Sequence, residues 1–285
     1  MGRCLMCSGM FTLVLALVIG CLEYVKKISF GDYQDMTPLG AAIMRITETM
    51  HEPASERLFE DVYALRLLPA SPARPGVRAL QWMAERFSLE HLVRMKPGGE
   101  AFLLWLGACR TRLIDDVLEM AIKDEARQVV VLGAGYDSRG IRLARDSVAF
   151  FEVDRPEVQE QKKWSLSQLP AGPRARMVSV DFSTQKLQDR LLAEGFDVSL
   201  KSVFVMEGVS QYISRAGLLD TLAFVGGLQN ATITFTYVHQ DVFQNPAALK
   251  ENMPLSALEQ LLESMRSAKE PWITGYRPSE FPAWL

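Results

Sequence analysis

Histidine, cysteine and excess positive charge are all scarce in this 285-residue chain. Its three histidines, His51, His91 and His239, are widely separated, which favours neither a metal cluster nor a histidine that activates a nucleophile. Three of the four cysteines fall within the first 21 residues, a distribution typical of neither a disulfide framework nor a zinc site. The net charge of −3 and an isoelectric point near 5.8 argue against a nucleic-acid partner. The sequence therefore predicts a protein that binds neither metal nor nucleic acid.

One long apolar run without charge is present, at residues 5–22. As a helix, these 18 residues would span about 27 Å, close to the hydrocarbon thickness of a membrane. The run is therefore predicted to be a membrane anchor, with a cleaved signal peptide or a core or partner-facing helix as alternatives. Arg3 on one side and Lys26 and Lys27 on the other are too evenly balanced to fix its orientation.

A buried strand that ends in a tight glycine turn is predicted for residues 129–139, which read VVVLGAGYDSR. Such a turn needs glycine, and it lets a nucleotide-like ligand approach the backbone closely. The third glycine of the dinucleotide fingerprint would fall at Ser138, so a nicotinamide dehydrogenase is the less favoured interpretation. Asp137 and Arg139 are placed to form an internal ion pair that fixes the turn.

Four further apolar runs follow, and three of them end in an acidic residue. They are residues 148–154 (VAFFEVD), 177–181 (MVSVD), 202–207 (SVFVME) and 232–238 (TITFTYV). Helix-compatible segments such as 184–194 and 214–225 separate them, which indicates a parallel sheet with helices on both faces. Acids at the carboxyl ends of parallel strands lie where such sheets bind ligands. Asp154 follows Gly135 by 19 positions, near the spacing of an acid that binds ribose hydroxyls.

In their order and spacing, these segments resemble the leucine carboxyl methyltransferase-like family of class I S-adenosylmethionine-dependent methyltransferases. The likeness is carried by GAGYDSR, by FEVDRP with a lysine at 162 or 163, by VDF and by MEGVSQYI. Residues 37–64 and 109–116 resemble the family's N-terminal helical cap. The resemblance implies an α/β fold, with a Rossmann-like class I methyltransferase sheet, helices on both faces and a helical cap.

The apolar run and the resemblance together give a division of the chain. The expected parts are an anchor segment (1–28) and a methyltransferase domain (29–285), the latter with a helical cap (29–125) and a cofactor-binding sheet (126–285). Members of the family continue with a sixth and a seventh strand, whereas here an amphipathic helix is expected over 253–267. The sheet is therefore expected to be shortened at its C-terminal end, which would leave the fifth strand as an exposed apolar edge.

The resemblance assigns part of the site for S-adenosyl-L-methionine to one arginine and two glycines. Arg110 would pair with the methionine carboxylate, which suits a planar two-pronged donor. Gly133 and Gly135 would let the backbone pass the methionine and ribose portions of the cofactor. The alternative for Arg110 is a surface arginine beside Arg112, because the two are hard to distinguish by helical register.

The remaining residues of the implied site follow the second, third and fourth strands. Asp154 would accept from the ribose hydroxyls. Asp181 would accept from the adenine amino group, and Phe182 would pack near the ring. Glu207 would face the sulfonium, with a helix cap as its alternative role.

The implied function is that of an enzyme, an S-adenosyl-L-methionine-dependent O-methyltransferase acting on a carboxylate of a small molecule or of a protein C-terminus. A carboxylate acceptor is already anionic and needs no base, whereas a hydroxyl acceptor would need one. No catalytic residue is identified, although Ser210, Gln211 and Tyr212 are candidate liners of the acceptor pocket. The alternative is a non-catalytic cofactor-binding or membrane-tethered interaction protein with a degenerate methyltransferase fold.

The cofactor also bears on location, because free S-adenosylmethionine is a cytosolic metabolite. The protein is therefore expected to be anchored in a membrane through residues 5–22, with its catalytic domain facing the cytosol. The alternative is a soluble cytoplasmic protein. A glycosylation triplet that begins at Asn230 can report the side of the membrane on which the domain lies.

Overall fold

The computed structural model describes seven segments of the chain. They are residues 36–51, 54–68, 99–172, 174–180, 185–249, 255–267 and 270–283. The predicted anchor at residues 5–22 lies outside them, as do the predicted adenine-binding residues Asp181 and Phe182. Within these segments, no helix combines the length and the apolar character needed to cross a bilayer. The membrane anchor therefore stays a prediction.

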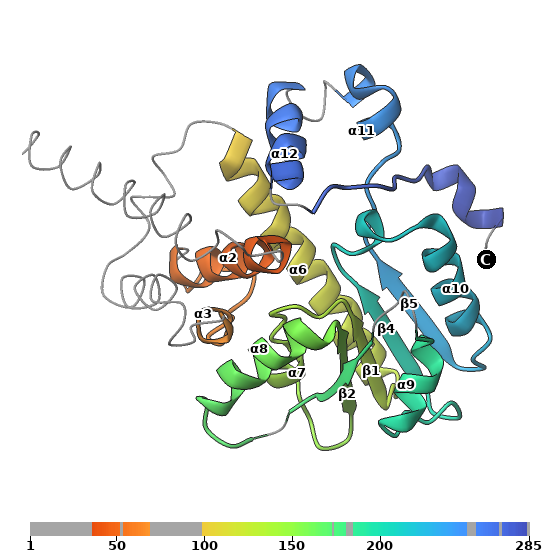
Figure 1. Cartoon of the computed structure of the whole chain (residues 1–285). Coiled ribbons are helices and arrows are strands. Elements are labelled where there is room, and N and C mark those ends of the chain that lie inside the picture. Colours follow the sequence, from red (N-terminus) through yellow and green to blue (C-terminus); the bar gives the residue numbers. More distant parts are fainter. Residues whose placement is uncertain are drawn as a thin grey trace, which may run out of the picture.

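Five parallel strands form one sheet in the spatial order β3–β2–β1–β4–β5 (Figure 1). The strands are β1 (Gln128–Leu132), β2 (Ala149–Asp154), β3 (Arg176–Ser179), β4 (Ser202–Met206) and β5 (Ala231–Phe235). The chain runs outward from β1 to β3 and then returns to place β4 on the other side of β1, so the strand order reverses there. In parallel α/β sheets, ligands bind beyond the carboxyl ends of the strands at such a reversal. The predicted fold class is confirmed.

Helices cover both faces of the sheet. They are α6 (Gly99–Lys123) and α7 (Arg139–Arg142), then α8 (Pro156–Ser167), α9 (Leu187–Ala193) and α10 (Arg215–Gly226). Neighbouring residues of β1 point to opposite faces, as a strand requires. Val129 and Val131 pack in a cluster with α6, while Val130 and Leu132 pack in a cluster with α9 and α10. Because both faces are covered, β1 is a continuous apolar run rather than an alternating one.

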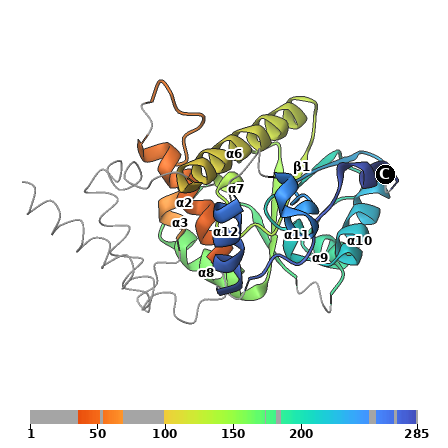
Figure 2. The ribbon, with the colours of Figure 1, turned by 90° about the horizontal axis from the view of Figure 1, so that it is seen from above.

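Two N-terminal helices, α2 (Met36–His51) and α3 (Ala64–Leu67), lie beside α6 and α8 (Figure 2). We call these two helices and the described residues between them the cap. The cap has its own apolar cluster, and Tyr136 from the glycine turn is part of it. Other buried members are Ala42, Ile46, Ala64, Leu67 and Leu68. The cap and the turn that follows β1 are therefore packed as one unit.

The C-terminal part begins at β5, the outer strand of the described sheet. Residues of β4 are all buried, whereas those of β5 are half-buried or exposed. The short helix η3 (Pro278–Ala283) packs Phe281 edge-to-face against Phe235, with ring centroids 5.4 Å apart. The amphipathic helix predicted for residues 253–267 is present as α12 (Leu255–Ser267). Among the described residues, no strand pairs with the outer edge of β5.

Candidate functional site

The turn between β1 and α7 needs glycine at two positions, as predicted. Gly133 has a φ of +66° and Gly135 one of +47°, both in the left-handed region that favours glycine. A Cβ on Gly133 would lie 2.3 Å from a methyl carbon of Val209, and one on Gly135 would lie 2.9 Å from Cβ of Pro38. The turn is thus pressed between the loop after β4 and the first turn of α2. We call residues 133–139 the glycine turn.

Asp154 ends β2 and directs its carboxylate at the glycine turn. Its Oδ2 accepts the N–H of Gly135 at 2.6 Å, and its Oδ1 accepts the N–H of Arg155 at 2.7 Å. Burial raises the pKa of the Asp154 carboxyl, although these two backbone donors act in the opposite direction. A carboxylate offers about four lone-pair sites, so capacity for two further donors remains. Gly135 and Asp154, which are 19 positions apart in the sequence, are therefore in direct contact in the structure.

Glu207 stands directly after β4 and is bonded to two arginines. Its Oε1 accepts from Nε of Arg110 at 2.7 Å, and its Oε2 accepts from Nη1 of Arg139, also at 2.7 Å. Burial disfavours the ionised form, but the charges of Arg139 and Arg110 outweigh it and lower the pKa of the Glu207 carboxyl. The Arg110 side chain is 31% exposed, against 1% for Arg139, so Arg110 is the arginine that a ligand can reach.

The structure also distinguishes Arg110 from its neighbour Arg112. Arg112 forms an ion pair with Asp116 one turn further along α6 and donates to the carbonyl oxygen of Leu58. The Arg112 and Asp116 side chains are both 51% exposed, as expected for a surface pair. Arg110 instead turns towards the carboxyl end of β4, through its contact with Glu207.

Arg139 is the buried centre of the charged cluster. Its Nη1 donates to Oδ2 of Asp137 at 2.6 Å, which confirms the ion pair expected within the turn. Its Nε donates to Oδ1 of Asp115 on α6 at 2.7 Å. Burial opposes ionisation of Asp137, but the charges of Arg139, Arg45 and Lys162 hold the pKa of its carboxyl well below the usual range. Arg139 thus joins α6, the glycine turn and β4, a connection that the sequence did not reveal.

Lys162, rather than Lys163, is the buried lysine of the FEVDRP segment. Its Nζ donates to the carbonyl oxygen of Asp137 at 2.5 Å and pairs with Oε2 of Glu152 at 2.6 Å. Lys163, by contrast, is exposed. Burial raises the pKa of the Glu152 carboxyl, and the charge of Lys162 acts against this rise. Lys162 therefore connects the backbone of the glycine turn with the Glu152 side chain of β2.

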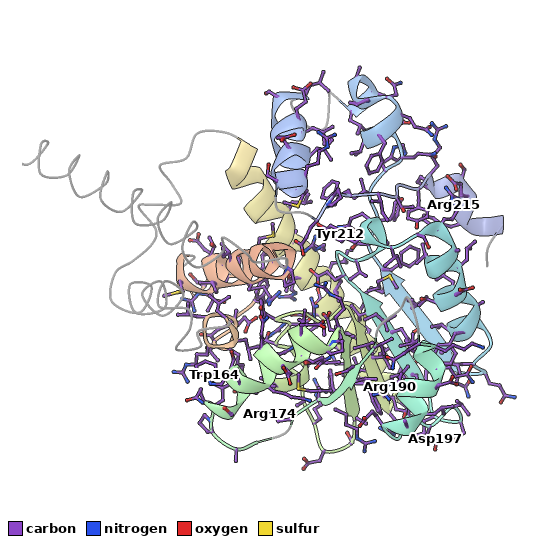
Figure 3. All side chains as sticks on the ribbon, in the orientation of Figure 1. Trp164, Arg174, Arg190, Asp197, Tyr212 and Arg215 are labelled. Atoms are coloured by element: carbon purple, nitrogen blue, oxygen red, sulfur yellow. The ribbon has the colours of Figure 1, made fainter. Side chains whose placement is uncertain are left out.

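The three candidate liners of the acceptor pocket have different environments. Ser210 is buried and donates to the carbonyl oxygen of Thr236, and Gln211 donates to that of Gly208. Tyr212 lies between the sheet and α12 (Figure 3), where its hydroxyl accepts from Nε1 of Trp272 at 2.8 Å. Tyr212, through its side chain, and Gln211, whose carbonyl oxygen accepts the N–H of Ile273 at 2.8 Å, both connect the end of β4 with the C-terminal segment.

His239 lies in the loop that follows β5. Nδ1 of His239 accepts the N–H of Asp241 at 3.3 Å, a local contact at the start of α11 (Asp241–Gln244). In the segments that the structure describes, no group of three or more His, Cys, Asp and Glu side chains could hold a metal ion.

Comparison with known proteins gives one family and several relatives. The family described as "Leucine carboxyl methyltransferase" matches residues 38–226. A Streptomyces coelicolor protein, "Putative S-adenosyl-L-methionine-dependent methyltransferase", is 32% identical over 200 residues, which cover 66% of this chain and 60% of that protein. A Mycobacterium tuberculosis protein of the same description is 38% identical over 130 residues, 44% of this chain and 41% of that one. The matches thus span less than two thirds of either relative.

A solved structure extends over more of the chain at lower similarity. It is described as a "putative O-methyltransferase" from Nostoc punctiforme and is 12% identical. The match covers 90% of this chain and 62% of that one, with a TM-score of 0.36, a likeness too distant to carry an argument.

Proposed function

Because the chain belongs to the leucine carboxyl methyltransferase family, we propose that it transfers the methyl group of S-adenosyl-L-methionine to an oxygen acceptor. The acceptor favoured here is a carboxylate, on a small molecule or at a protein C-terminus. The observation that carries this proposal is the pair of contacts at the reversal point of the sheet. Asp154 meets Gly135 at the end of β1 and β2, and Arg110 meets Glu207 at the end of β4.

The donors and acceptors at this point fit the chemical groups of the cofactor. The carboxylate of Asp154 has lone pairs left for the two ribose hydroxyls. Nε of Arg110 donates to Glu207. The two Nη groups of Arg110 are therefore the ones proposed to pair with the methionine carboxylate. The positive φ values of Gly133 and Gly135 set the path of the turn backbone at this point, and the missing Cβ atoms leave room for Val209 and Pro38. The adenine contacts implied for Asp181 and Phe182 remain part of the proposal.

Glu207 takes a modified role in this proposal. Both of its oxygens already accept from arginines, so its negative charge is largely compensated. A direct attraction to the sulfonium is therefore weaker than the sequence resemblance implies. We infer that Glu207 chiefly orients Arg110, as a carboxylate that fixes the guanidinium plane for a second carboxylate.

The chemistry needs alignment more than acid–base catalysis. When bound, S-adenosyl-L-methionine supplies a methyl group that is already activated by its sulfonium. The chain must hold the donor, align the acceptor in line with the bond that breaks, and exclude water. A carboxylate acceptor needs no proton removed, so this reaction does not require His239, which lies beside Asp241, to act as a base. Tyr212 is the candidate for orienting the acceptor.

We further propose that residues 1–28 tether this domain, residues 29–285, to a membrane and that the domain faces the cytosol. The apolar run at residues 5–22 supports the tether, and the need for a cytosolic cofactor supports the orientation.

The second candidate is a cofactor-binding or interaction protein without turnover. It is favoured by β5, whose residues are half-buried or exposed and whose outer edge pairs with no strand among the described residues. An open edge of this kind is a surface for pairing with another chain.

Calorimetry and a methyl-transfer assay on the full chain separate the candidates. The enzyme and a cofactor-binding protein both predict binding of S-adenosylhomocysteine with a Kd in the micromolar range, about −8 kcal/mol. Formation of radiolabelled methyl esters, from methyl-labelled S-adenosyl-L-methionine and a panel of carboxylic acids and C-terminal peptides, would support the enzyme. Binding without turnover on the whole panel would favour the second candidate. A folded protein that does not bind the ligand would contradict the enzyme and a cofactor-binding protein, and would leave only the interaction protein.

A further inference from the structure

The backbone of the glycine turn is bonded to the cap through Arg45. This arginine lies on α2 and is only 4% exposed. Its Nη2 donates to the carbonyl oxygen of Tyr136 at 2.7 Å, and its Nε donates to Oδ2 of Asp61 at 3.0 Å. The N–H that contacts Asp154 belongs to the peptide between Ala134 and Gly135, and the carbonyl that Arg45 holds belongs to the peptide two units further along, between Tyr136 and Asp137.

Asp61 reaches the same turn by a second route. Its Oδ2 also accepts from the hydroxyl of Ser138 at 2.6 Å. Its Oδ1 accepts the N–H groups of Tyr63 and Ala64, at 3.1 and 2.9 Å, where α3 begins. The side chain has no exposed surface. One buried carboxylate therefore connects α2, α3 and the glycine turn.

Apolar contacts run alongside these bonds. The side chain of Tyr136 is 1% exposed and packs with Ala42 and Ile46 of the cap. Pro38 in the first turn of α2 lies against Gly135. The glycine turn thus has one face on the sheet and another on the cap.

We propose that Arg45 and Asp61 are positioning residues, through which the cap sets the affinity of the glycine turn for its ligand. The proposal rests on the proposed function, in which this turn receives S-adenosyl-L-methionine. Two glycines with positive φ give the turn access to many conformations. The bonds at Tyr136 and Ser138 restrict that freedom just after the second glycine. Without them, only a fraction of molecules holds the binding conformation, and the apparent Kd rises by the inverse of that fraction.

Two mild variants of the full chain test the proposal. Ser138→Ala removes only the hydroxyl that reaches Asp61. Arg45→Lys keeps the positive charge, but an ammonium cannot serve both Asp61 and the Tyr136 carbonyl. Each should raise the Kd for S-adenosylhomocysteine about five- to tenfold, as expected if about one tenth to one fifth of molecules hold the competent turn. Hydrogen exchange in peptides covering residues 133–139 should become faster in both variants.

A cap variant that does not touch the turn is the matched control. Glu48→Met keeps a side chain of similar length and removes the carboxylate that accepts the backbone N–H of Leu58 at 2.6 Å, a bond of the cap that involves neither Arg45 nor Asp61. It should lower the Tm, as the two test variants do, and leave the Kd within about twofold of wild type. Equal weakening by Glu48→Met and Ser138→Ala would overturn the proposal, because general loosening of the cap would then explain both.

Asp154→Ala separates this proposal from the proposed function. If wild type binds, Asp154→Ala does not, and both test variants match wild type, the positioning role is wrong and the cofactor site stands. If folded wild type does not bind S-adenosylhomocysteine, the cofactor site and the positioning role are both wrong. Weakened binding in the two test variants together with an unaffected control is the expected result.

Discussion

Replacing Asp154 by alanine is the most direct test of the cofactor site. The substitution removes the carboxylate that accepts from Gly135 and from Arg155, and with it the proposed acceptor for the ribose hydroxyls. Glu152, the other acid of β2, cannot take over. Its side chain is 3% exposed and forms an ion pair with Lys162, which also donates to the backbone of the glycine turn.

The expected magnitudes differ between folding and binding. Hydrogen bonds to a charged group are worth about 1.5–3 kcal/mol, so the Kd for S-adenosylhomocysteine should rise about 10- to 150-fold. The ligand-free protein should lose about 1–2 kcal/mol of unfolding free energy, because the buried N–H of Gly135 loses its acceptor. Water can replace the acceptor of the exposed Arg155 N–H, and the burial that raises the pKa of the Asp154 carboxyl is relieved.

The increase in unfolding free energy on adding ligand measures the loss of binding separately from the loss of folding stability. At a ligand concentration of 100 times the wild-type Kd, wild type should gain about 2.7 kcal/mol. A variant with a 50-fold higher Kd should gain only about 0.6 kcal/mol. Asp197→Ala is the control, because Asp197 also accepts a backbone N–H but lies away from Tyr212 and the carboxyl ends of the strands (Figure 3). An unchanged ligand-induced gain in Asp154→Ala would refute the assignment.

Three further outcomes follow from the arginines, from Glu207 and from the N-terminus. Arg110→Lys should raise the Kd for S-adenosylhomocysteine about tenfold by calorimetry, since an ammonium lacks the two-pronged geometry, while Arg112→Lys should leave it unchanged. Glu207→Gln should be less stable than wild type in urea unfolding at pH 7. Because the pKa of the Glu207 carboxyl is lowered in the folded state, its stabilisation is present above the ordinary value of 4.5 and is lost as the pH falls through the folded value. A difference from wild type that stays constant down to pH 3 would contradict this reasoning. The full chain should sediment with membranes, resist salt extraction and carry no glycan at Asn230 in a eukaryotic host. Glycan there would contradict a cytosolic domain, and recovery in the soluble fraction with residues 1–28 intact would contradict the anchor.

The parts of the site that were predictable are local in the sequence. A glycine turn after an apolar run and an acid 19 positions later both belong to one strand–helix–strand unit. The Asp137–Arg139 pair joins residues two positions apart. Lys162 could have been preferred over Lys163, because Val158, Lys162 and Ser165 share one buried helical face. These contacts could be predicted because each joins residues within one strand–helix–strand unit.

The contacts that escaped prediction join distant residues. Arg45 is 91 positions from Tyr136, and no local pattern connects them. One signal was present, since Arg45 falls three residues after Ala42 and directly before Ile46, on the apolar face of α2. A charge at such a position has to find a buried partner, but the sequence does not say which one. The partner depends on how the cap packs against the sheet.

The double role of α6 bears on how the protein can be divided. The helix supplies Ile114 and Leu118 to the core beneath β1, and Asp115 between them to Arg139. A truncation at residue 126 would therefore uncover the apolar surface that α6 covers and leave a buried guanidinium short of an acceptor. The cofactor-binding half should not fold as an isolated module, and fragment complementation should succeed only when the first fragment carries α6. The practical cutting point lies before this helix, not after it.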